Sequence, residues 1–545
     1  MAVFARVSYV ALATSAVAGL ARAELGDLIA ERLDAGSAAA YRAALKERAP
    51  QAEARLRPIL AALPRGAGGA YDAPAVRYAL HQDLARNYGW HLLGLDPAGE
   101  AWNSSSIADI AALRRLPEEA RAAVARASAS GMGAGDVAEL AATLEFVVRD
   151  EARRQLLETY KKLGLRVDAP VRREEALLAV EAYVTSLLLK EDVRSLESKE
   201  ALMEKHGSIG EVYPLWPRMQ AFVQAEFERE VRGGDPVSFE QAMRASWVVG
   251  DDFGGWQKEN ICRDLTKSLV EIEDQGTGRV LLTAFYKAAL DDGKWQFQES
   301  EGYLRQLGAL DESNPGSPRV IIPNWVNGRS NCVGSSDFHD VCCVSECDSL
   351  LATLERTLAA PAASPAEIEA VVSALPSSTA AAGRDIGDLQ RSRLWAIASA
   401  HEGVVPIYGR LFAQWLHHAY PRECPYPHRA GTTKPVGIFE VDVAGLASEE
   451  DMKALASRRQ RRSAPVHSMP WSSEEEVFAE PGASRPVGLA AVQGAVLLAA
   501  FATMALGYAR TALRGARRQL QGAGTEKKPR ARRAEAAGVQ TGLEV

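Results

Sequence analysis

The sequence predicts a mainly α-helical protein, with a helical ectodomain that contains a disulfide-bonded module and one transmembrane helix. Three observations favour this fold class. Hydrophobic residues make up 47% of the chain but aromatic residues only 7%, so alanine and other helix formers dominate the apolar fraction. Apolar residues recur at helical spacing in the first part of the body. One late segment, residues 487–508, carries no charge at all.

The two ends of the chain predict a single-pass type I membrane protein. Residues 1–23 are typical of a secretory signal peptide, because a basic residue precedes a short apolar run and a small-x-small cleavage pattern. Residues 487–508 are long enough to span a bilayer, and the positive-inside rule places the basic tail of residues 509–545 in the cytosol. Residues 24–486 are then extracytosolic, in the secretory pathway or at the plasma membrane.

Residues 24–205 are expected to form a domain of amphipathic helices. Asp136 and Glu139 predict the capping-box start of one helix, and Gly164 predicts its end. The apolar residues between them follow the spacing of a buried stripe: Leu140, Leu144, Val147, Leu156, Tyr160 and Leu163. Such stripes indicate a packed core rather than a cofactor site.

The cysteines agree with an extracytosolic body. All six lie before the predicted span, at positions Cys262, Cys332, Cys342, Cys343, Cys347 and Cys424. An even number in an oxidising compartment predicts up to three disulfides, and fifteen pairings are open. The spacing of Cys343 and Cys347 also suits one helix face, so a metal or free-thiol role is an alternative. The sequon that begins at Asn103 predicts a glycoprotein.

Residues 260–290 contain an apolar helical face, a glycine-containing loop and a second apolar helix. This pattern resembles an EF-hand. The resemblance puts Gly278 at the sixth loop position, where φ must be positive, and makes the calcium loop from residues at its first, third, fifth and seventh positions. Those metal-site residues are Glu273, Gln275, Thr277 and Arg279.

Several departures make this EF-hand degenerate. Ala284 stands at the twelfth position, where calcium needs a bidentate carboxylate. A second candidate loop, Asp311 to Ile322, contains two prolines and no terminal glutamate. The similar segments Arg279–Leu282 and Arg319–Ile322 predict a short antiparallel pairing of the two loops. We therefore expect a structural EF-hand-like pair in a domain of residues 206–330, with Ca²⁺ as a weak ligand at most.

Residues 331–430 form a Cys/His-rich helical module with two interpretations. The first gives its histidines structural roles in a disulfide-fixed module, and the absence of a His-Glu-x-x-His motif favours it. The alternative is a metal-dependent hydrolase that uses His339, His417 and His428. The segment from Gly409 to His428 also resembles secretory proteins of unicellular algae, and that resemblance implies no activity.

The function predicted from these features is binding or interaction at a membrane surface. Residues 431–486 are expected to form a flexible stalk, and the run Arg458 to Arg462 is a candidate processing site. The acidic body excludes nucleic acid as its partner, which leaves an extracytosolic protein or glycan. No catalytic motif is present, so we assign no enzymatic activity from the sequence.

Overall fold

The computed structural model describes residues 25–95, 107–292, 296–334, 336–437, 440–441, 444–457 and 470–477. The predicted signal peptide, the sequon, the candidate processing site, the span and the basic tail lie outside these residues. No described helix is both long and apolar enough to cross a membrane. The structure therefore does not support the predicted single-pass membrane protein, and we correct that prediction.

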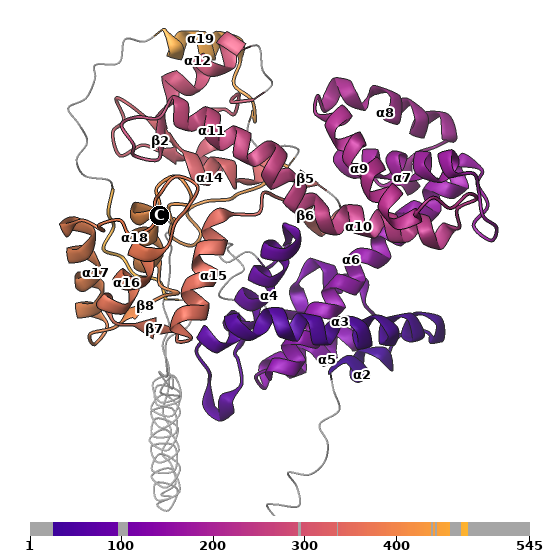
Figure 1. Ribbon diagram of the computed structural model, residues 1–545, viewed down its shortest axis with the longest axis horizontal. Helices are drawn as coiled ribbons and strands as arrows, with labels where there is room; N and C mark the ends of the chain where they lie inside the picture. The colour runs from indigo at the N-terminus through magenta and orange to yellow at the C-terminus, as the bar shows by residue number, and fades with distance from the viewer. Residues whose placement is uncertain are drawn as a thin grey trace, which may run out of the picture. The chain divides into compact units, whose positions relative to one another are not determined.

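The described residues are mainly helical, as predicted (Figure 1). The described residues of the first part of the chain include nine α-helices: α2 (Leu25–Ala30), α3 (Ala35–Ala62), α4 (Ala73–Tyr88), α5 (Glu118–Ala129), α6 (Ala134–Leu163), α7 (Arg173–Leu188), α8 (Lys199–Val212), α9 (Trp216–Val231) and α10 (Phe239–Gln257). The long helices α3 and α6 pack along each other. Their contact forms the centre of this helical part.

The residues that the sequence offers as caps predict both ends of α6 to within a few residues. Gly164 caps the C-terminus in the left-handed region, with φ of 73°. The start lies slightly earlier than predicted, because the Asp136 carboxylate accepts a hydrogen bond from the Gly133 backbone N–H at 2.9 Å. Glu139 instead accepts from the distant Gly26 N–H at 2.7 Å. Asp136 is thus the reciprocal residue of the cap, and Glu139 has a tertiary role.

The rest of the chain alternates short strands and helices. Its helices are α11 (Arg263–Glu271), α12 (Leu282–Asp292), α13 (Glu301–Gln306), α14 (Ile322–Val326), α15 (Glu346–Leu358), α16 (Pro365–Ala374), α17 (Asp388–Ala400), α18 (Arg410–Ala419) and α19 (Glu449–Ala456). The strands of the molecule are β1 (Trp90–Leu92), β2 (Arg279–Leu281), β3 (Leu310–Asp311), β4 (Arg319–Ile321), β5 (Val333–Gly334), β6 (His339–Val341), β7 (Ala362–Ala363) and β8 (Val405–Pro406).

The strands form three small antiparallel sheets among the described residues. Their orders are β1-β6-β5, β2-β4-β3 and β7-β8. In the first sheet, Trp90 lies opposite Val341, so a strand from the helical part pairs with one from the Cys/His-rich module. This pairing joins segments that are far apart in the chain.

The buried apolar residues form two cores. The larger core combines residues of α2 to α10 with residues 338–424. The smaller core contains the buried residues of α11 to α14, and Met452 of α19 joins it. Figure 1 shows α19 against α12, where the two helices pack. The change from one core to the other along the chain falls between Phe253 and Ile261.

Two pieces of the range predicted as a stalk are packed against the body. Helix α19 buries Met452, which is 5% exposed. Residues 470–477 lie along α18: the Arg410 backbone N–H donates to the Glu476 carbonyl at 3.0 Å, and the Leu411 N–H donates to the Glu475 carboxylate at 2.9 Å. These pieces therefore contribute side chains to the body.

Three disulfides use all six cysteines, as predicted. The pairs are Cys262–Cys343, Cys332–Cys342 and Cys347–Cys424. The alternative role of Cys343 and Cys347 in a metal site is wrong, because each is bonded to a different partner. The Cys262–Cys343 bond ties the smaller core to the Cys/His-rich module.

Candidate functional site

The two predicted loops pair as expected from their sequences. Strand β2 runs antiparallel to β4, with Val280 directly opposite Val320. Both valines are fully buried. Gly278 has a φ of 70°, as its predicted loop position requires. The register places Val320 opposite Val280, in agreement with the similarity of their two segments.

Three of the four residues of the predicted calcium loop, Glu273, Thr277 and Arg279, are engaged by protein groups. The Gly278 backbone N–H donates to the Glu273 carboxylate at 2.5 Å, and Arg422 contacts the other carboxylate oxygen with Nη2 at 2.6 Å. The Thr277 hydroxyl donates to the Asp274 carbonyl at 2.7 Å. Arg279 directs its guanidinium to Asp311, with Nε 2.8 Å from Oδ2. A cation, Arg422, thus already neutralises the carboxylate at the first loop position.

These residues do not fit a calcium ion. Ca²⁺ takes six to eight oxygen ligands, several of them carboxylate oxygens. Glu273 is committed to Arg422, and Ala284 offers no oxygen at the twelfth position. Among the described residues, no group of three or more His, Cys, Asp or Glu side chains is placed to hold a metal. We assign no chemistry to calcium here.

The segment that carries Arg422 is seated directly on the loop. A Cβ atom added to Gly278 would lie 2.0 Å from the Pro421 carbonyl oxygen. Both a positive φ and this close approach therefore require glycine at position 278. Two residues beyond Arg422, Cys424 is bonded to Cys347 of α15. The loop, Arg422 and α15 are consequently held together.

Beside the paired loops lies a polar cavity of about 440 Å³. Its walls come from both loops, from α17 and from the segment after residue 469. The lining residues are Asp274, Gln275, Thr277, Arg279, Asp311, Ser313, Asn314, Arg319, Arg393, Pro470 and Trp471. We call this space the arginine cavity. Its volume suits a small-molecule ligand.

Two of the arginines come from equivalent positions of the paired strands. Arg279 precedes Val280 in β2, and Arg319 precedes Val320 in β4, so the register puts both on the sheet face opposite the buried valines. Each contacts a carboxylate of the other loop at 2.8 Å: Arg279 contacts Asp311, and Arg319 contacts Asp274. The two crossed ion pairs fix both guanidinium groups at the cavity wall.

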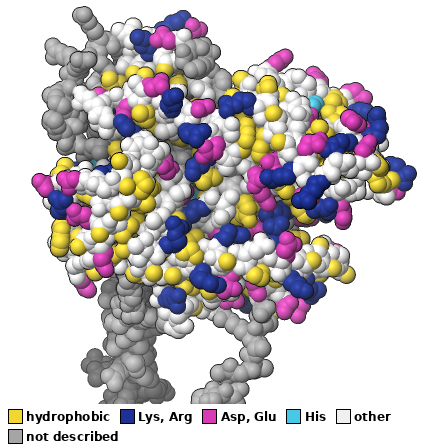
Figure 2. All heavy atoms as spheres, in the orientation of Figure 1, with side chains coloured by type: hydrophobic (Ala, Val, Ile, Leu, Met, Phe, Trp, Pro, Cys, Tyr) yellow, Lys and Arg dark blue, Asp and Glu magenta, His cyan; other side chains and the backbone are white. Residues whose placement is uncertain are grey.

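The third arginine has a different environment. The Arg393 guanidinium lies over the Trp471 ring, 4.6 Å from its centroid. No described carboxylate forms an ion pair with it. Burial lowers the pKa of Arg393, but an arginine keeps its charge at neutral pH. On the face drawn in Figure 2, acidic and basic side chains are interspersed, whereas three guanidinium groups share this one cavity with two carboxylates.

Two neutral histidines of α18 lie next to the arginine cavity. His417 Nδ1 is 2.7 Å from the Cys424 carbonyl oxygen, which only accepts, so this nitrogen carries the proton. His417 Nε2 then accepts from Arg279 Nη2 at 3.4 Å. Burial and the charge of Arg279 hold the pKa of His417 well below its usual range. Burial and the charge of Arg393 lower the pKa of His418 to about 3.

The predicted hydrolase cluster is not formed, and we correct that alternative. His428 donates through Nε2 to the Gly308 carbonyl at 2.7 Å, and both His428 and His417 pack on Tyr426. His339 instead lies in β6 and lines a different cavity. Because the three histidines are not brought together as a metal-binding group, the structure gives no support to a metal-dependent hydrolase.

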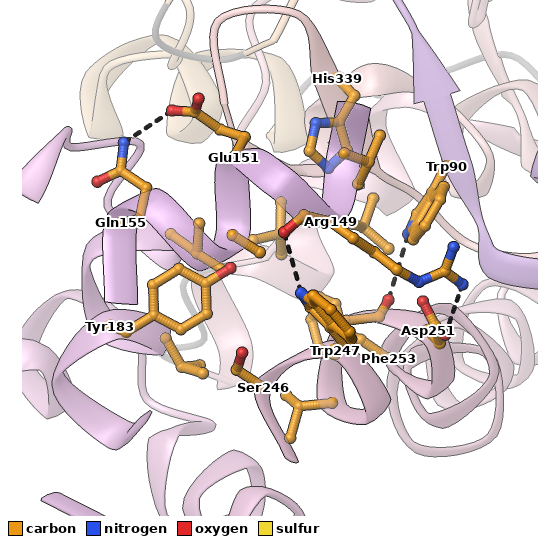
Figure 3. Close-up of a pocket in the computed structure, with 18 of the residues that line it drawn as sticks. Trp90, Arg149, Glu151, Gln155, Tyr183, Ser246, Trp247, Asp251, Phe253 and His339 are labelled. Carbon is orange, nitrogen blue, oxygen red and sulfur yellow. Dashed lines mark hydrogen bonds and ion pairs between the residues drawn. The ribbon is translucent and has the colours of Figure 1, made fainter. Parts of the chain in front are cut away.

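That second cavity lies between α6, α7 and α10, and its volume is about 60 Å³ (Figure 3). We call it the apolar cavity, because most of its wall is aliphatic or aromatic. Arg149 anchors one side, with Nη2 2.7 Å from the Asp251 carboxylate. The Trp247 indole N–H donates to the Arg149 carbonyl at 2.9 Å. These bonds, drawn dashed in Figure 3, fix that wall.

Three of the four residues predicted for the calcium loop, Gln275, Thr277 and Arg279, line the arginine cavity. Arg319, Arg393 and Trp471 were missed, because they lie on separate elements with no common motif spacing. The only local signal was the similarity of the segments that begin with Arg279 and Arg319. Comparisons with protein-family models, curated proteins and solved structures find no match for this chain.

Proposed function

We propose that the protein binds a small anionic molecule, through a carboxylate, phosphate or sulfate group, in the arginine cavity. The observation that carries this proposal is the convergence of Arg279, Arg319 and Arg393 on one cavity of about 440 Å³. Guanidinium groups present several donors in a fixed plane and match the geometry of oxyanions.

The charge balance of the cavity supports an anionic ligand. The carboxylates of Asp274 and Asp311 each pair with one arginine, and the nearby His417 and His418 are neutral. Arg393 therefore supplies the excess positive charge. Its stacking on Trp471 holds the guanidinium in place without neutralising it.

The remaining wall suggests an organic anion larger than a bare ion. Trp471 gives the cavity an aromatic surface, and Gln275, Ser313 and Asn314 add neutral polar groups. Such a combination of one charged anchor, an aromatic surface and a few polar groups is typical of small-molecule sites. We use phenyl phosphate and benzoate as probes, because each combines an oxyanion with an aromatic ring.

Calorimetric titration of the full chain tests the proposal. We expect saturable binding of phenyl phosphate or benzoate, and no binding of the neutral benzamide. Arg393→Ala should weaken binding about 10-fold or more, because hydrogen bonds to charged groups contribute about 1.5–3 kcal/mol each. This variant leaves no described carboxylate without its partner, so it tests the ligand contact rather than the fold.

The matched control is Arg391→Ala in the same helix, α17. Arg391 is paired with Glu369, Asp385 and Asp388 and does not line the cavity. Its loss should leave the affinity unchanged. The proposal fails if neither probe binds, if benzamide binds as well as benzoate, or if the two variants weaken binding equally.

A further inference from the structure

The first arginine of the arginine cavity is committed to protein partners. Arg279 Nε lies 2.8 Å from the Asp311 carboxylate, and Nη1 donates to the Thr277 carbonyl at 3.3 Å. Its Nη2 donates to His417 Nε2 at 3.4 Å. Arg279 therefore contributes its positive charge to the cavity while its three nitrogens hold the protein together.

The other two arginines keep more of their hydrogen-bond donors. Arg319 donates through Nε to Asp274 at 2.8 Å and through Nη1 to the Ser317 carbonyl at 2.9 Å. Arg393 makes no hydrogen bond with a described residue, and its guanidinium is held over the Trp471 ring. It can thus present two parallel N–H groups to one oxyanion, which is the geometry that guanidinium groups favour.

The side chains that line the cavity carry one net positive charge. Three guanidinium groups face two carboxylates, and the other lining residues are neutral. Asp274 and Asp311 come from the two paired loops, so an anion bound to Arg393 shares a cavity of about 440 Å³ with both carboxylates. One negative charge on the ligand balances this wall. A second charge would find no further cation there and would be repelled by both carboxylates in a site partly shielded from water.

We propose that the arginine cavity selects organic anions with a single negative charge, a carboxylate or a sulfate ester, and discriminates against phosphate monoesters. This selection rests on the proposed function and narrows its ligand to one class. Arg393 supplies the paired donors, while Asp274 and Asp311 repel the second charge that a phosphate monoester carries at neutral pH. Specificity arises from such a repulsive element together with an attractive one.

Calorimetric titration of the full chain at pH 8 with phenyl sulfate and phenyl phosphate tests the selection. The two probes share the same ring and the same tetrahedral oxyanion, but the phosphate carries a second negative charge at this pH because its second pKa is about 6. We expect phenyl sulfate to bind about 10-fold or more tightly than phenyl phosphate, since the juxtaposition of like charges is strongly disfavoured. Benzoate, which also has one charge, should bind more tightly than phenyl phosphate as well.

Two substitutions remove a repelling charge without a change in side-chain size. Asp274→Asn should tighten the binding of phenyl phosphate about 10-fold relative to that of phenyl sulfate. Asp311→Asn should have the same effect, and it decides the result if the first variant does not fold. Glu312→Gln is the matched control, because Glu312 follows Asp311 directly but pairs with Arg305 and does not line the cavity. Its ratio of the two affinities should equal that of the wild type.

The results of these titrations distinguish the selection from the proposed function. If phenyl phosphate binds as tightly as phenyl sulfate, anion binding stands and the selection is overturned. The same conclusion follows if the folded variants Asp274→Asn and Asp311→Asn keep the wild-type ratio, or if Glu312→Gln changes it as much as they do. If none of the three probes binds, the selection and the proposed function both fail.

Discussion

At the scale of single residues, the guanidinium group of Arg422 fixes the first of the paired loops through its ion pair with Glu273. Arg422 contacts the Glu273 carboxylate with Nε at 2.9 Å and Nη2 at 2.6 Å. The Glu273 side chain is 4% exposed, whereas that of Arg422 is 27% exposed. Glu273 is thus the more buried member of the ion pair. Loss of Arg422 would leave this buried carboxylate unpaired and so destabilise the loop.

Arg422→Ala is expected to lower the free energy of unfolding by about 2–3 kcal/mol, less than for a fully buried pair because Arg422 is partly exposed. Urea denaturation measures the change. Arg429→Ala is the control, since its ion pair with Glu474 is more than half exposed on both sides. Its effect should stay within about 0.5 kcal/mol. Equal effects of the two variants would refute the role given to Arg422.

At the scale of elements, the contact of α3 with α6 contains a buried ionic network. The Glu145 carboxylate of α6 has no exposed surface and contacts Arg48 and Arg55 of α3 and Arg149 of α6, at 3.2, 2.5 and 2.9 Å. Burial alone would raise the pKa of Glu145, but the charges of Arg149 and Arg55 outweigh it and hold the pKa below its ordinary value.

Glu145→Ala should destabilise the protein by about 3–5 kcal/mol, because it leaves buried guanidinium groups without their shared carboxylate. Chemical denaturation gives the value. Glu158→Ala lies in the same helix and breaks only an exposed pair with Lys161, so it should cost less than about 1 kcal/mol. A loss below 1 kcal/mol for Glu145→Ala would show that the network contributes little.

Elements with local signals were predictable, and contacts between distant elements were not. The residues from Asp136 to Gly164 specify a helix by their own caps and stripe, and Gly278 specifies the turn of the first loop. The β1–β6 pairing joins strands of three residues each, which are too short to show the alternation of apolar and polar residues that predicts a strand. The arginine cavity likewise depends on residues from loops, α17 and the chain after residue 469, whose approach is decided by tertiary packing.

At the scale of the whole molecule, the disulfides differ in the length of chain that they close. Cys347–Cys424 closes 77 residues, whereas Cys332–Cys342 closes 10. The chain-entropy relation gives about 4.5 kcal/mol for the longer loop and about 2.7 kcal/mol for the shorter one. Replacing each pair by alanines should therefore lower the unfolding free energy more for Cys347–Cys424, as thermal and urea unfolding would record. The reverse order would contradict this expectation.

Buried titratable groups make the stability of the molecule depend on pH in two opposing ways. Burial lowers the pKa of His339 to about 3, so below about pH 6.5 the unfolded chain binds a proton that the folded chain does not. Stability from this residue is thus lost as the pH falls. Burial raises the pKa of Glu299 to about 7, so its contribution is present below about pH 4.5 and is lost as the pH rises through 7.

Proton uptake on unfolding at pH 5.5 separates these two groups. His339→Gln should reduce the uptake by about one proton, which lowers the slope of the unfolding free energy against pH by about 1.4 kcal/mol per pH unit. Glu299→Gln should increase the uptake by about one proton, because the variant has no carboxyl to release it. Denaturation curves at pH 5, 5.5 and 6 give both slopes. If both variants have the same slope of unfolding free energy against pH as the wild type, the pKa shifts given to His339 and Glu299 are wrong.

The pairing of Trp90 with Val341 has a consequence for synthesis on the ribosome. The partner of β1 is translated about 250 residues later, and at about 5–20 residues per second this interval lasts roughly 12–50 s. During that time the hydrogen-bonding edge of β1 and the apolar side chains beneath it have no native cover. Water hydrogen-bonds this edge of the nascent chain until β6 is made, and a translational pause before residue 341 would prolong its exposure.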